Sequence, residues 1–376
     1  MWLVLSCTQE ESGSGNADPK PEPPTTSDPG TSGLAYIFKE RTDGYNCYRI
    51  PAIIKTKEGS LLAFAEARKL NCKDEGDIDL VVKRSTDGGK TWGEMQVIWD
   101  DADNTCGNPA PVIDQRTGKI HLLMTWNLGA DHISEINKGS SQDTRRVFAT
   151  ASQDDGLTWD KPREITSSVK RPGWGWYATG PCHGLQISQG AYAGRLVIPC
   201  DYIEVGAGGR GYSHVIYSDD GGETWQIGGV SPRDKANEST VAELSDGRLM
   251  LNMRSSTSIR QVATSTDGGK TWQDMRPDYA LVEPVCQGSL LNHRINNVHT
   301  LLFSNPASST RDNMTIKMST NDGKNWQKSY KVHAGPSAYS DLAMVAEDKV
   351  GILYEGGVAN PYQGIAFKII PVADFR

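Results

Sequence analysis

Short apolar runs alternate along this chain with turns rich in glycine, asparagine and aspartate. Each run follows a glycine or another turn residue and has the length and β-branched content of a strand. Helical periodicity is almost absent. We therefore expect equivalent strands at six places: residues 59–68, 118–127, 194–201, 247–254, 298–305 and 350–355.

A second pattern, Ser-x-Asp-x-Gly-x-Thr-Trp, recurs between these runs. Full copies begin at Ser85, Ser152, Ser218 and Ser265, and a weaker copy begins at Ser319, where asparagine replaces both Asp and Thr. The Asp suits a tight turn because it accepts local backbone hydrogen bonds, and the Gly suits it because it adopts positive φ. Each copy is expected to close a hairpin, with its Trp beginning the returning strand and covering the turn.

The two repeats together predict an all-β fold. Six strand units, each joined to a further hairpin, are best satisfied by a six-bladed β-propeller of four-stranded antiparallel sheets. A pair of β-sandwiches is the alternative, but it explains neither the repeated Trp turn nor the lack of a linker after residue 36. Equivalent strands of a propeller end at one face, so Arg68, Arg254 and Glu355 are expected to meet in a polar site there.

The first 33 residues differ in composition from the rest of the chain. Residues 8–33 are rich in Pro, Ser, Thr and Gly and contain no aromatic or large aliphatic residue, so we expect a disordered tether. The run before it, ending at Cys7, resembles the lipobox of a bacterial lipoprotein, although the basic start of a normal signal peptide is missing. That resemblance implies membrane attachment through a lipidated Cys7 and a secreted, periplasmic or cell-surface location. The propeller domain is expected over residues 34–376.

Composition excludes several classes of function. The net charge of −7 argues against nucleic acid as a partner. No apolar run approaches the roughly 20 residues of a transmembrane helix. The cysteines form no Cys-x-x-Cys pair, so no zinc site is expected, and no metal-ligand cluster or cofactor motif appears. Disulfides are compatible with the cysteine content, but the sequence does not pair them.

Tyr48-Arg49-Ile50-Pro51, followed by the Ser-x-Asp-x-Gly-x-Thr-Trp repeats, resembles the sialidases (exo-α-neuraminidases) whose sequences carry such boxes. The resemblance runs from about residue 36 to the C-terminus. It implies a retaining glycoside hydrolase that removes terminal sialic acid from glycoproteins, glycolipids and oligosaccharides, without a cofactor. A monomer is expected.

The resemblance assigns an arginine triad to Arg49, Arg254 and Arg311, each of which lies in a family motif. Three guanidinium groups directed at one place suit a carboxylate, because guanidinium is permanently charged and its planar fork matches carboxylate geometry. Glu355, in Leu-Tyr-Glu-Gly-Gly, matches the carboxylate that braces the first arginine.

The same resemblance assigns the reacting groups. Asp74 resembles the general acid/base, although Glu75, Asp77 and Asp79 lie close to it in sequence. We expect the Asp74 pKa to be raised by shielding or by the bound anionic substrate. Tyr339 resembles the nucleophile and Glu238 its base partner; a neutral phenol avoids the repulsion that an anionic nucleophile would meet at a sugar carrying a carboxylate.

Further substrate contacts are implied around these residues. Arg68 matches an arginine that contacts ring substituents, and Asn108 lies where many relatives have Asp. The expected lining of the N-acetyl pocket is Met124, Trp126 and Gln287. Trp174, Trp176 and Tyr177 either contact the sugar or pack against a blade edge, whereas His183 and Glu243 are assigned structural roles.

Two other functions remain open from the sequence. A non-catalytic propeller that binds glycans would be expected to lack Asp74, Glu238 or Tyr339, and all three are present. Transfer of sialic acid to another sugar, or internal transfer to an anhydro product, uses overlapping residues. The sequence leaves linkage preference undecided.

Overall fold

The computed structural model describes residues 33–206 and 208–376. Cys7 and nearly all of the expected tether lie outside the described residues, so lipidation, location and the tether stay predictions. Within the described part of the chain, no helix combines the length and apolar character needed to cross a membrane.

Almost all regular structure in the described residues is β-strand, as predicted, and the two α-helices are single short turns. The helical elements are α1 (Ile133–Lys138), α2 (Thr166–Val169), η1 (Gly190–Tyr192) and η2 (Val372–Asp374). The strands are β1 (Tyr36–Lys39), β2 (Cys47–Lys55), β3 (Leu61–Arg68), β4 (Ile78–Ser85), β5 (Gln96–Trp99), β6 (Thr105–Ile113), β7 (Ile120–Asn127), β8 (Arg146–Ser152), β9 (Arg163–Glu164), β10 (Trp174–Thr179), β11 (Leu185–Gln186), β12 (Leu196–Glu204), β13 (Gly211–Ser218), β14 (Gln226–Val230), β15 (Ala236–Glu243), β16 (Leu249–Ser255), β17 (Ile259–Ser265), β18 (Gln273–Val282), β19 (Ser289–Ile295), β20 (Val298–Pro306), β21 (Asp312–Ser319), β22 (Lys328–Ala346), β23 (Lys349–Gly356) and β24 (Gly364–Pro371).

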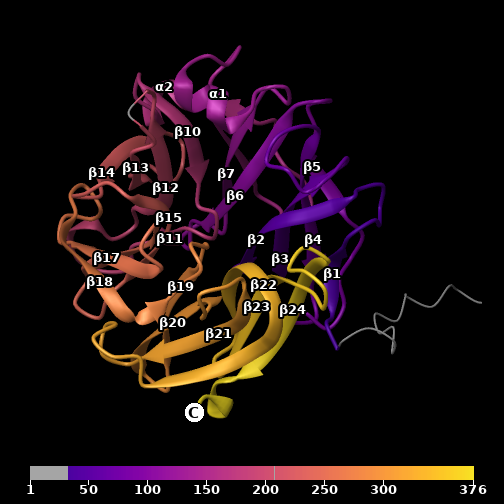
Figure 1. Ribbon diagram of the computed structural model, residues 1–376. Helices are drawn as coiled ribbons and strands as arrows, with labels where there is room; N and C mark the ends of the chain where they lie inside the picture. The colour runs from indigo at the N-terminus through magenta and orange to yellow at the C-terminus, as the bar shows by residue number, and fades with distance from the viewer. Residues whose placement is uncertain (1–32, 207) are drawn as a thin grey trace, which may run out of the picture.

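The strands form antiparallel sheets that surround a central channel, the arrangement of a β-propeller (Figure 1). Strands β15-β16-β17-β18 make one four-stranded sheet, and β10-β12-β13-β14, with β11 beside β12, make another. The order β2-β3-β4 continues into β6-β7-β8-β9 through a parallel pairing of Ile78 with Thr105. Strand β22 is long enough to pair with β21 through its first part and with β23 through its second.

The predicted hairpin turns have the expected hydrogen bonds. In the first copy, the Thr91 amide donates to Asp87 Oδ1 (3.0 Å), the Gly89 amide donates to Ser85 Oγ (2.9 Å), and Gly89 has φ of 88°. One detail differs: the returning strand begins after the Trp, directly after Trp225 and four residues after Trp92. The Trp92 ring packs against Phe367, 5.3 Å between ring centroids, and Trp225 packs in a core cluster.

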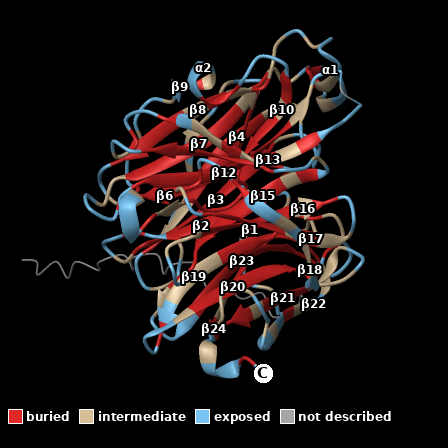
Figure 2. Cartoon of the chain, turned by 90° about the vertical axis from the view of Figure 1, so that its left-hand side faces the viewer, coloured by how far each residue is buried: buried red, intermediate tan, exposed pale blue. Residues whose placement is uncertain are grey.

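Apolar side chains fill the spaces between neighbouring sheets, and the interior strands are buried along most of their length (Figure 2). One such cluster joins Val197 and Val215 to Val241, Leu249 and residues around them. Because this packing is contiguous around the ring, the strand ends that face the channel are held in fixed relative positions.

Candidate active site

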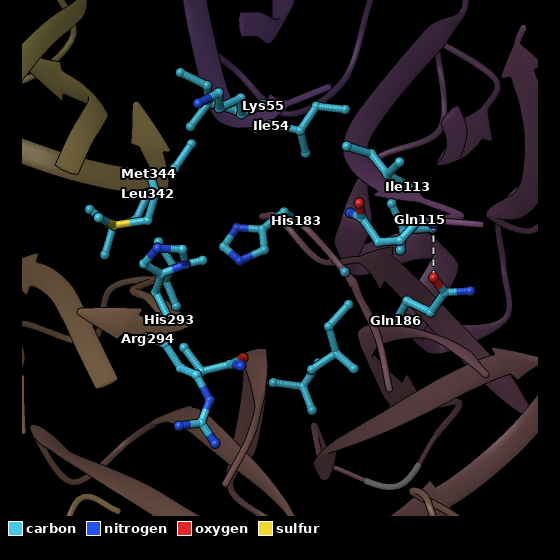
Figure 3. Close-up of a pocket in the computed structure, with 18 of the residues that line it drawn as sticks. Ile54, Lys55, Ile113, Gln115, His183, Gln186, His293, Arg294, Leu342 and Met344 are labelled. Atoms are coloured by element: carbon cyan, nitrogen blue, oxygen red, sulfur yellow. Dashed lines mark hydrogen bonds between the residues drawn. The ribbon is translucent and has the colours of Figure 1, made fainter. Parts of the chain in front are cut away.

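The channel has a cavity at each end. At one end of the channel, strands β2, β6 and β15 contribute residues from near their starts, and β22 contributes Tyr339 from its second part, to a cavity of about 250 Å³. Their last residues line a larger cavity of about 740 Å³ at the other end (Figure 3). The predicted reacting residues lie at the smaller cavity, so we place the candidate site there.

His183 lies inside the larger cavity and has a structural partner. Its Nδ1 is 2.7 Å from Asp341 Oδ1, and the same carboxylate accepts bonds from the Ile53 amide (2.9 Å) and the Ser289 hydroxyl (2.6 Å). The Asp341 carboxylate therefore ties together strands from different parts of the ring. This contact agrees with the structural role predicted for His183.

Tyr339 and Glu238 form the centre of the smaller cavity. The Tyr339 hydroxyl donates to Glu238 Oε1 (2.5 Å), and Arg254 Nη1 donates both to Glu238 Oε2 (2.6 Å) and to the Tyr339 oxygen (3.1 Å). Burial and the neighbouring Glu238 charge raise the Tyr339 pKa well above its ordinary value, against the opposing effect of Arg254 and Arg49. The phenol is therefore neutral in the resting protein, with an acceptor in place for its proton.

Glu355 fixes the position of Arg49. It is fully buried and accepts from Arg49 Nε (2.9 Å), Arg49 Nη2 (3.2 Å), the Ile50 amide (2.9 Å) and the Tyr339 amide (3.1 Å). The bracing role predicted for this carboxylate thus extends to the backbone that carries Tyr339. One buried anion sets the distance between the two strands that supply Arg49 and Tyr339.

Arg311 reaches the same place from the turn between β20 and β21. Its guanidinium carbon is 5.7 Å from the centre of the Tyr339 ring, and that of Arg49 is 5.0 Å from it. Arg311 Nη1 donates to the Tyr362 hydroxyl (2.7 Å). Together with the Arg254 contact to the Tyr339 oxygen, these distances show that the three predicted arginines converge around one tyrosine. Tyr362 was not found from the sequence, because it lies in no recognisable motif.

Asp74 lies on the loop after β3, and this loop is anchored at several points. A disulfide joins Cys72 to Cys47 at the start of β2. Arg68 Nη1 donates to the carbonyl oxygens of Cys72 and Lys73 (both 2.6 Å) and lies 2.9 Å from Asp74 Oδ1. Two of the three acidic residues that made the assignment ambiguous have other partners: Asp77 Oδ1 is 3.2 Å from Lys69 Nζ, and Asp79 accepts from the Tyr45 hydroxyl (2.5 Å).

The expectation that shielding raises the Asp74 pKa is wrong for the ligand-free protein. Partial burial acts in that direction, but the positive charges of Arg68 and Arg49 outweigh it and lower the pKa. The side chain is still about half exposed (55%), whereas Arg68 is almost completely buried. Asp74 is therefore a carboxylate held between two arginines at the mouth of the cavity.

Trp126 and Gln287, which were predicted to bind substrate, are among the residues that do not line this cavity. Trp126 lies on the outer side of its strand, where its indole donates to Asp101 Oδ2 (2.7 Å). Gln287 is buried and fully used by the backbone: it donates to Pro181 and Ser340 carbonyl oxygens (2.9 and 3.0 Å) and accepts from the Ser340 amide (3.0 Å). Gln287 thus holds the residue after Tyr339 in place, and Met124 is likewise enclosed in the core.

For the three aromatic residues of β10, the sequence left open whether they contact the sugar or pack against a blade edge. Trp174 and Tyr177 are buried in the core, and Trp176 lines the cavity. Glu243 has the structural role expected of it, because it accepts from the backbone amides of Ser188 (2.8 Å) and Gln189 (3.2 Å).

The cavity wall on the side of β6, β10 and β12 contains residues that sequence reasoning largely missed. We call it the amide wall and define it as Asn108, Arg145, Trp176, Asp201 and Asn237, all of which line the cavity. Asn108 had been predicted, and Trp176 had been left open between a sugar contact and packing against a blade edge. The missed Asp201 is the last residue of the predicted run 194–201, so the rule that selected Arg68, Arg254 and Glu355 would also have selected it. Arg145 had no such signal.

No group of three or more metal-ligating side chains occurs among residues 33–206 and 208–376. The cavity itself is lined by acids, arginines and a tyrosine. A neutral phenol beside a carboxylate base, under converging guanidinium groups, is suited to nucleophilic attack next to a bound anion.

Comparison with known proteins agrees with this class of site and fold. Residues 59–352 match the family model described as a BNR repeat-like domain. The chain is 34% identical to a sialidase of Micromonospora viridifaciens over 85% of its length, and 30% identical to an exo-alpha-sialidase of Aspergillus fumigatus over the same share. It covers 51% and 81% of these two relatives. A solved structure, the Hadza microbial sialidase Hz136, superposes with a TM-score of 0.83 at 32% identity, covering 91% of this chain and 69% of that one.

The chain belongs to the sialidase family. It spans about half the length of the Micromonospora relative, so the activity of the whole protein is treated below as a proposal.

Proposed function

We propose that this protein is an exo-α-sialidase that hydrolyses terminal sialic acid from glycoconjugates with retention of configuration, through a covalent bond between Tyr339 and the sugar. The catalytic unit is proposed to be residues 34–376, folded as six four-stranded blades. The observation that carries the proposal is the position of the Tyr339 hydroxyl, between Glu238 Oε1 (2.5 Å) and Arg254 Nη1 (3.1 Å).

The arginines around Tyr339 provide the binding site for the sugar's carboxylate. Arg49, Arg254 and Arg311 approach the tyrosine from three different parts of the ring. Glu355 forms an ion pair with Arg49, and Glu238 forms one with Arg254. Arg311 contacts the neutral Tyr362 hydroxyl, so its positive charge is the least compensated of the three. A carboxylate bound here places the adjacent anomeric carbon next to the phenol oxygen.

The first displacement then follows from the two hydrogen bonds of Tyr339. Its oxygen attacks the anomeric carbon while its proton passes to Glu238, and the glycosidic bond breaks as Asp74 protonates the leaving oxygen. In the second displacement, Asp74 takes a proton from water, the water oxygen bonds to the anomeric carbon, and the phenol leaves with the proton from Glu238. Two inversions at one carbon give net retention.

Asp74 must be protonated for the first step, although its pKa is lowered in the ligand-free protein. The substrate resolves this conflict, because its carboxylate neutralises part of the arginine charge that lowers the pKa. Binding of the anion is therefore expected to raise the Asp74 pKa and to make the acid available when substrate is present.

The test is proton NMR of sialyllactose during digestion by the wild-type protein. Release of free sialic acid, first as the α anomer and then mutarotating to β, supports hydrolysis with retention. First appearance of the β anomer would refute the covalent tyrosyl route. A 2,7-anhydro product or a new sialylated sugar would instead assign the alternative, transfer of sialic acid, and no change in the sugar would reject both.

A further inference from the structure

The larger cavity, at the end of the channel away from Tyr339, has a buried inner end and an exposed mouth. Strand β22 runs from Tyr339 into its wall, so the residue order along β22 measures depth: Leu342 is 1% exposed, whereas Glu347, the residue after the strand, is exposed. The wall from Leu342 to Ala346 is about 13 Å long, at roughly 3.3 Å per residue. With a volume of about 740 Å³, the cavity has the size of a small-molecule site.

The wall of this cavity is mainly apolar. Aliphatic side chains of β2, β6, β15, β19 and β22 line it, including Ile54, Ile113 and Met344 (Figure 3). The lysine, arginine and glutamate members of the lining are all exposed and therefore lie at the mouth: Lys55, Arg294 and Glu347. The wall suits the apolar body of a ligand, but by itself it does not orient that body.

His183 places a polar group among these apolar side chains. Its ring projects into the middle of the cavity, and the residue is only 8% exposed (Figure 3). Nδ1 is 2.7 Å from Asp341 Oδ1, and the other groups bonded to that carboxylate are donors, so Nδ1 carries a proton. No atom of residues 33–206 and 208–376 forms a hydrogen bond with Nε2. The structural contact thus uses one ring nitrogen and leaves the other for a ligand.

The pairing with Asp341 sets the charge on this ring. Burial lowers the His183 pKa, but the charge and the hydrogen bond of Asp341 raise it by more, so the net shift is upward from the ordinary value of 6.5. His293 lines the same cavity, and burial lowers its pKa. Near pH 6.5, His183 is therefore mainly protonated and His293 mainly neutral. The charged donor that faces the cavity is Nε2–H of His183.

The surroundings of His183 favour binding of an anion over other roles. Of the described residues that line the cavity, Glu347 is the only carboxylate, and it lies at the mouth together with Lys55 and Arg294. The histidine is not arranged to activate a nucleophile of the protein, because the neighbouring Cys182 directs its Sγ to backbone carbonyl oxygens and no described hydroxyl contacts Nε2. The free nitrogen is therefore a donor for a bound group.

We propose that the larger cavity is a second ligand site, which binds an amphipathic monocarboxylate with its carboxylate on His183 Nε2 and its alkyl chain along the apolar wall toward the mouth. A single buried charged donor matches one negative charge, whereas a phosphate would leave further charged oxygens against aliphatic side chains. An unbranched acid such as octanoate, in its extended form, is shorter than the wall. The site is separate from Tyr339, and the inference does not rest on the proposed function.

The test is calorimetry of the full chain at about pH 6.5 with octanoate, octanamide and octylammonium, which share one chain length and differ in head group. The 2,3-unsaturated analogue of sialic acid is present at saturation, because the arginines around Tyr339 would otherwise also attract a carboxylate. His183→Asn is the main variant: its Nδ2 can replace Nδ1 as the donor to Asp341, but nothing replaces Nε2. His293→Asn is the matched control, since it makes the same change in the same cavity.

We expect octanoate to bind one site per chain, and octanamide and octylammonium to bind about tenfold or more weakly. His183→Asn should weaken octanoate binding about tenfold or more and abolish the preference over octanamide. His293→Asn should change octanoate binding less than about threefold. If His183→Asn does not fold, nitrogen NMR of the histidine side chains replaces it: octanoate should shift the Nε2 signal of a histidine that is still present in His293→Asn, and octanamide should not.

Three results would overturn the inference: no binding of octanoate while the analogue fills the site at Tyr339, equal binding of octanoate and octanamide by wild type, or equal effects of the two histidine substitutions. Binding of octanoate only in the absence of the analogue counts as the first of these, because the arginines would then hold the carboxylate. Failure of the analogue to bind would reject the proposed function instead. The comparison of His183→Asn with His293→Asn would still decide this inference from the octanoate data alone.

Discussion

The two sides of the candidate active-site cavity neutralise their charges in different ways. On the side of Tyr339, Arg49 and Arg254 each contact a carboxylate directly, Glu355 at 2.9 Å and Glu238 at 2.6 Å. In the amide wall, Arg145 contacts only amide oxygens and an indole ring, and Asp201 accepts a single bond, from the Asn237 amide (3.0 Å).

The two arrangements suit two different tasks of a binding site. A direct ion pair fixes a guanidinium in place and leaves it able to meet another anion, which suits a site that must hold a carboxylate while a bond is broken. Amide partners leave a buried charge uncompensated, which costs folding stability. In return, the guanidinium has only donors, so each neighbouring amide must turn its oxygen toward it. Substitutions on the Tyr339 side should therefore affect turnover most, and those in the amide wall should affect selectivity and pH dependence.

The largest effect is expected for Tyr339→Phe. Loss of the nucleophilic oxygen should reduce kcat by roughly a thousandfold or more, because the remaining groups have no covalent route. Binding of the unsaturated analogue should change little, since the arginines remain. Tyr354→Phe, which removes a hydroxyl from a buried tyrosine of the core, is the matched control and should keep its turnover. Turnover of Tyr339→Phe close to wild type would remove Tyr339 from the proposed role.

A smaller loss is expected for Glu355→Gln. The amide cannot balance Arg49 and cannot accept from all four of its present donors. Unpairing a buried charge typically costs about 3–5 kcal/mol of folding stability. Displacement of Tyr339 and Arg49 should lower kcat/KM about a hundredfold. Urea unfolding and steady-state kinetics measure the two effects. A stable variant with unchanged kcat/KM would show that Glu355 does not position either group.

The Tyr339 side of the site was largely predictable from sequence, and the reason is physical. Arg254 and Glu355 lie at the ends of predicted strands, which the repeat places at one end of the channel. Arg49 and Tyr339 were assigned by the resemblance of their motifs to the sialidases. The strands themselves were predictable because a short apolar run between two glycine turns can adopt few other secondary structures. The Ser-x-Asp-x-Gly-x-Thr-Trp turns were equally predictable, because their hydrogen bonds are local.

The amide wall was less predictable because its contacts depend on tertiary packing. Arg145 and Arg146 are adjacent and chemically alike, yet Arg145 is buried against Trp176 and Arg146 is half-buried over Trp126. Nothing local distinguishes them. The prediction that Trp126 and Gln287 bind the sugar was wrong for a different reason. Both residue types suit a sugar pocket, but the alternation of strand faces directs Trp126 outward. The Gln287 side chain is occupied by backbone groups that need hydrogen-bond partners.

A moderate effect is expected when the disulfide of the Asp74 loop is removed by the double substitution Cys47→Ala and Cys72→Ala. The bridge ties the loop to β2, but Arg68 still holds two of its carbonyl groups. We expect kcat/KM to fall about three- to tenfold and the stability to fall by about 3 kcal/mol. The comparison is with Cys106→Ala, which removes a buried free thiol and should leave kcat/KM unchanged. Equal kcat/KM for the double variant and wild type would mean that Arg68 alone positions Asp74.

The smallest effect on turnover is expected for Asp201→Asn. Burial and the nearby Glu238 charge raise the Asp201 pKa well above its ordinary value, and Arg254 and Arg145 do not offset them. Both effects favour the protonated carboxyl group, so an amide of the same shape should keep kcat/KM within about twofold.

The effect of Asp201→Asn on stability has a definite sign. A raised folded pKa means that, above the unfolded value of about 4, the native state binds more protons than the unfolded state, so wild-type stability falls as the pH rises. The Asn variant lacks this decline, so its stability should increase relative to wild type as the pH rises above about 4, by up to about 1.4 kcal/mol per pH unit until the folded pKa of Asp201 is reached. Urea unfolding at several pH values measures the difference, with Asp348→Asn as the exposed control. Parallel pH profiles of Asp201→Asn and wild type would mean that Asp201 is ionised, and that the amide wall balances Arg145 with a charge after all.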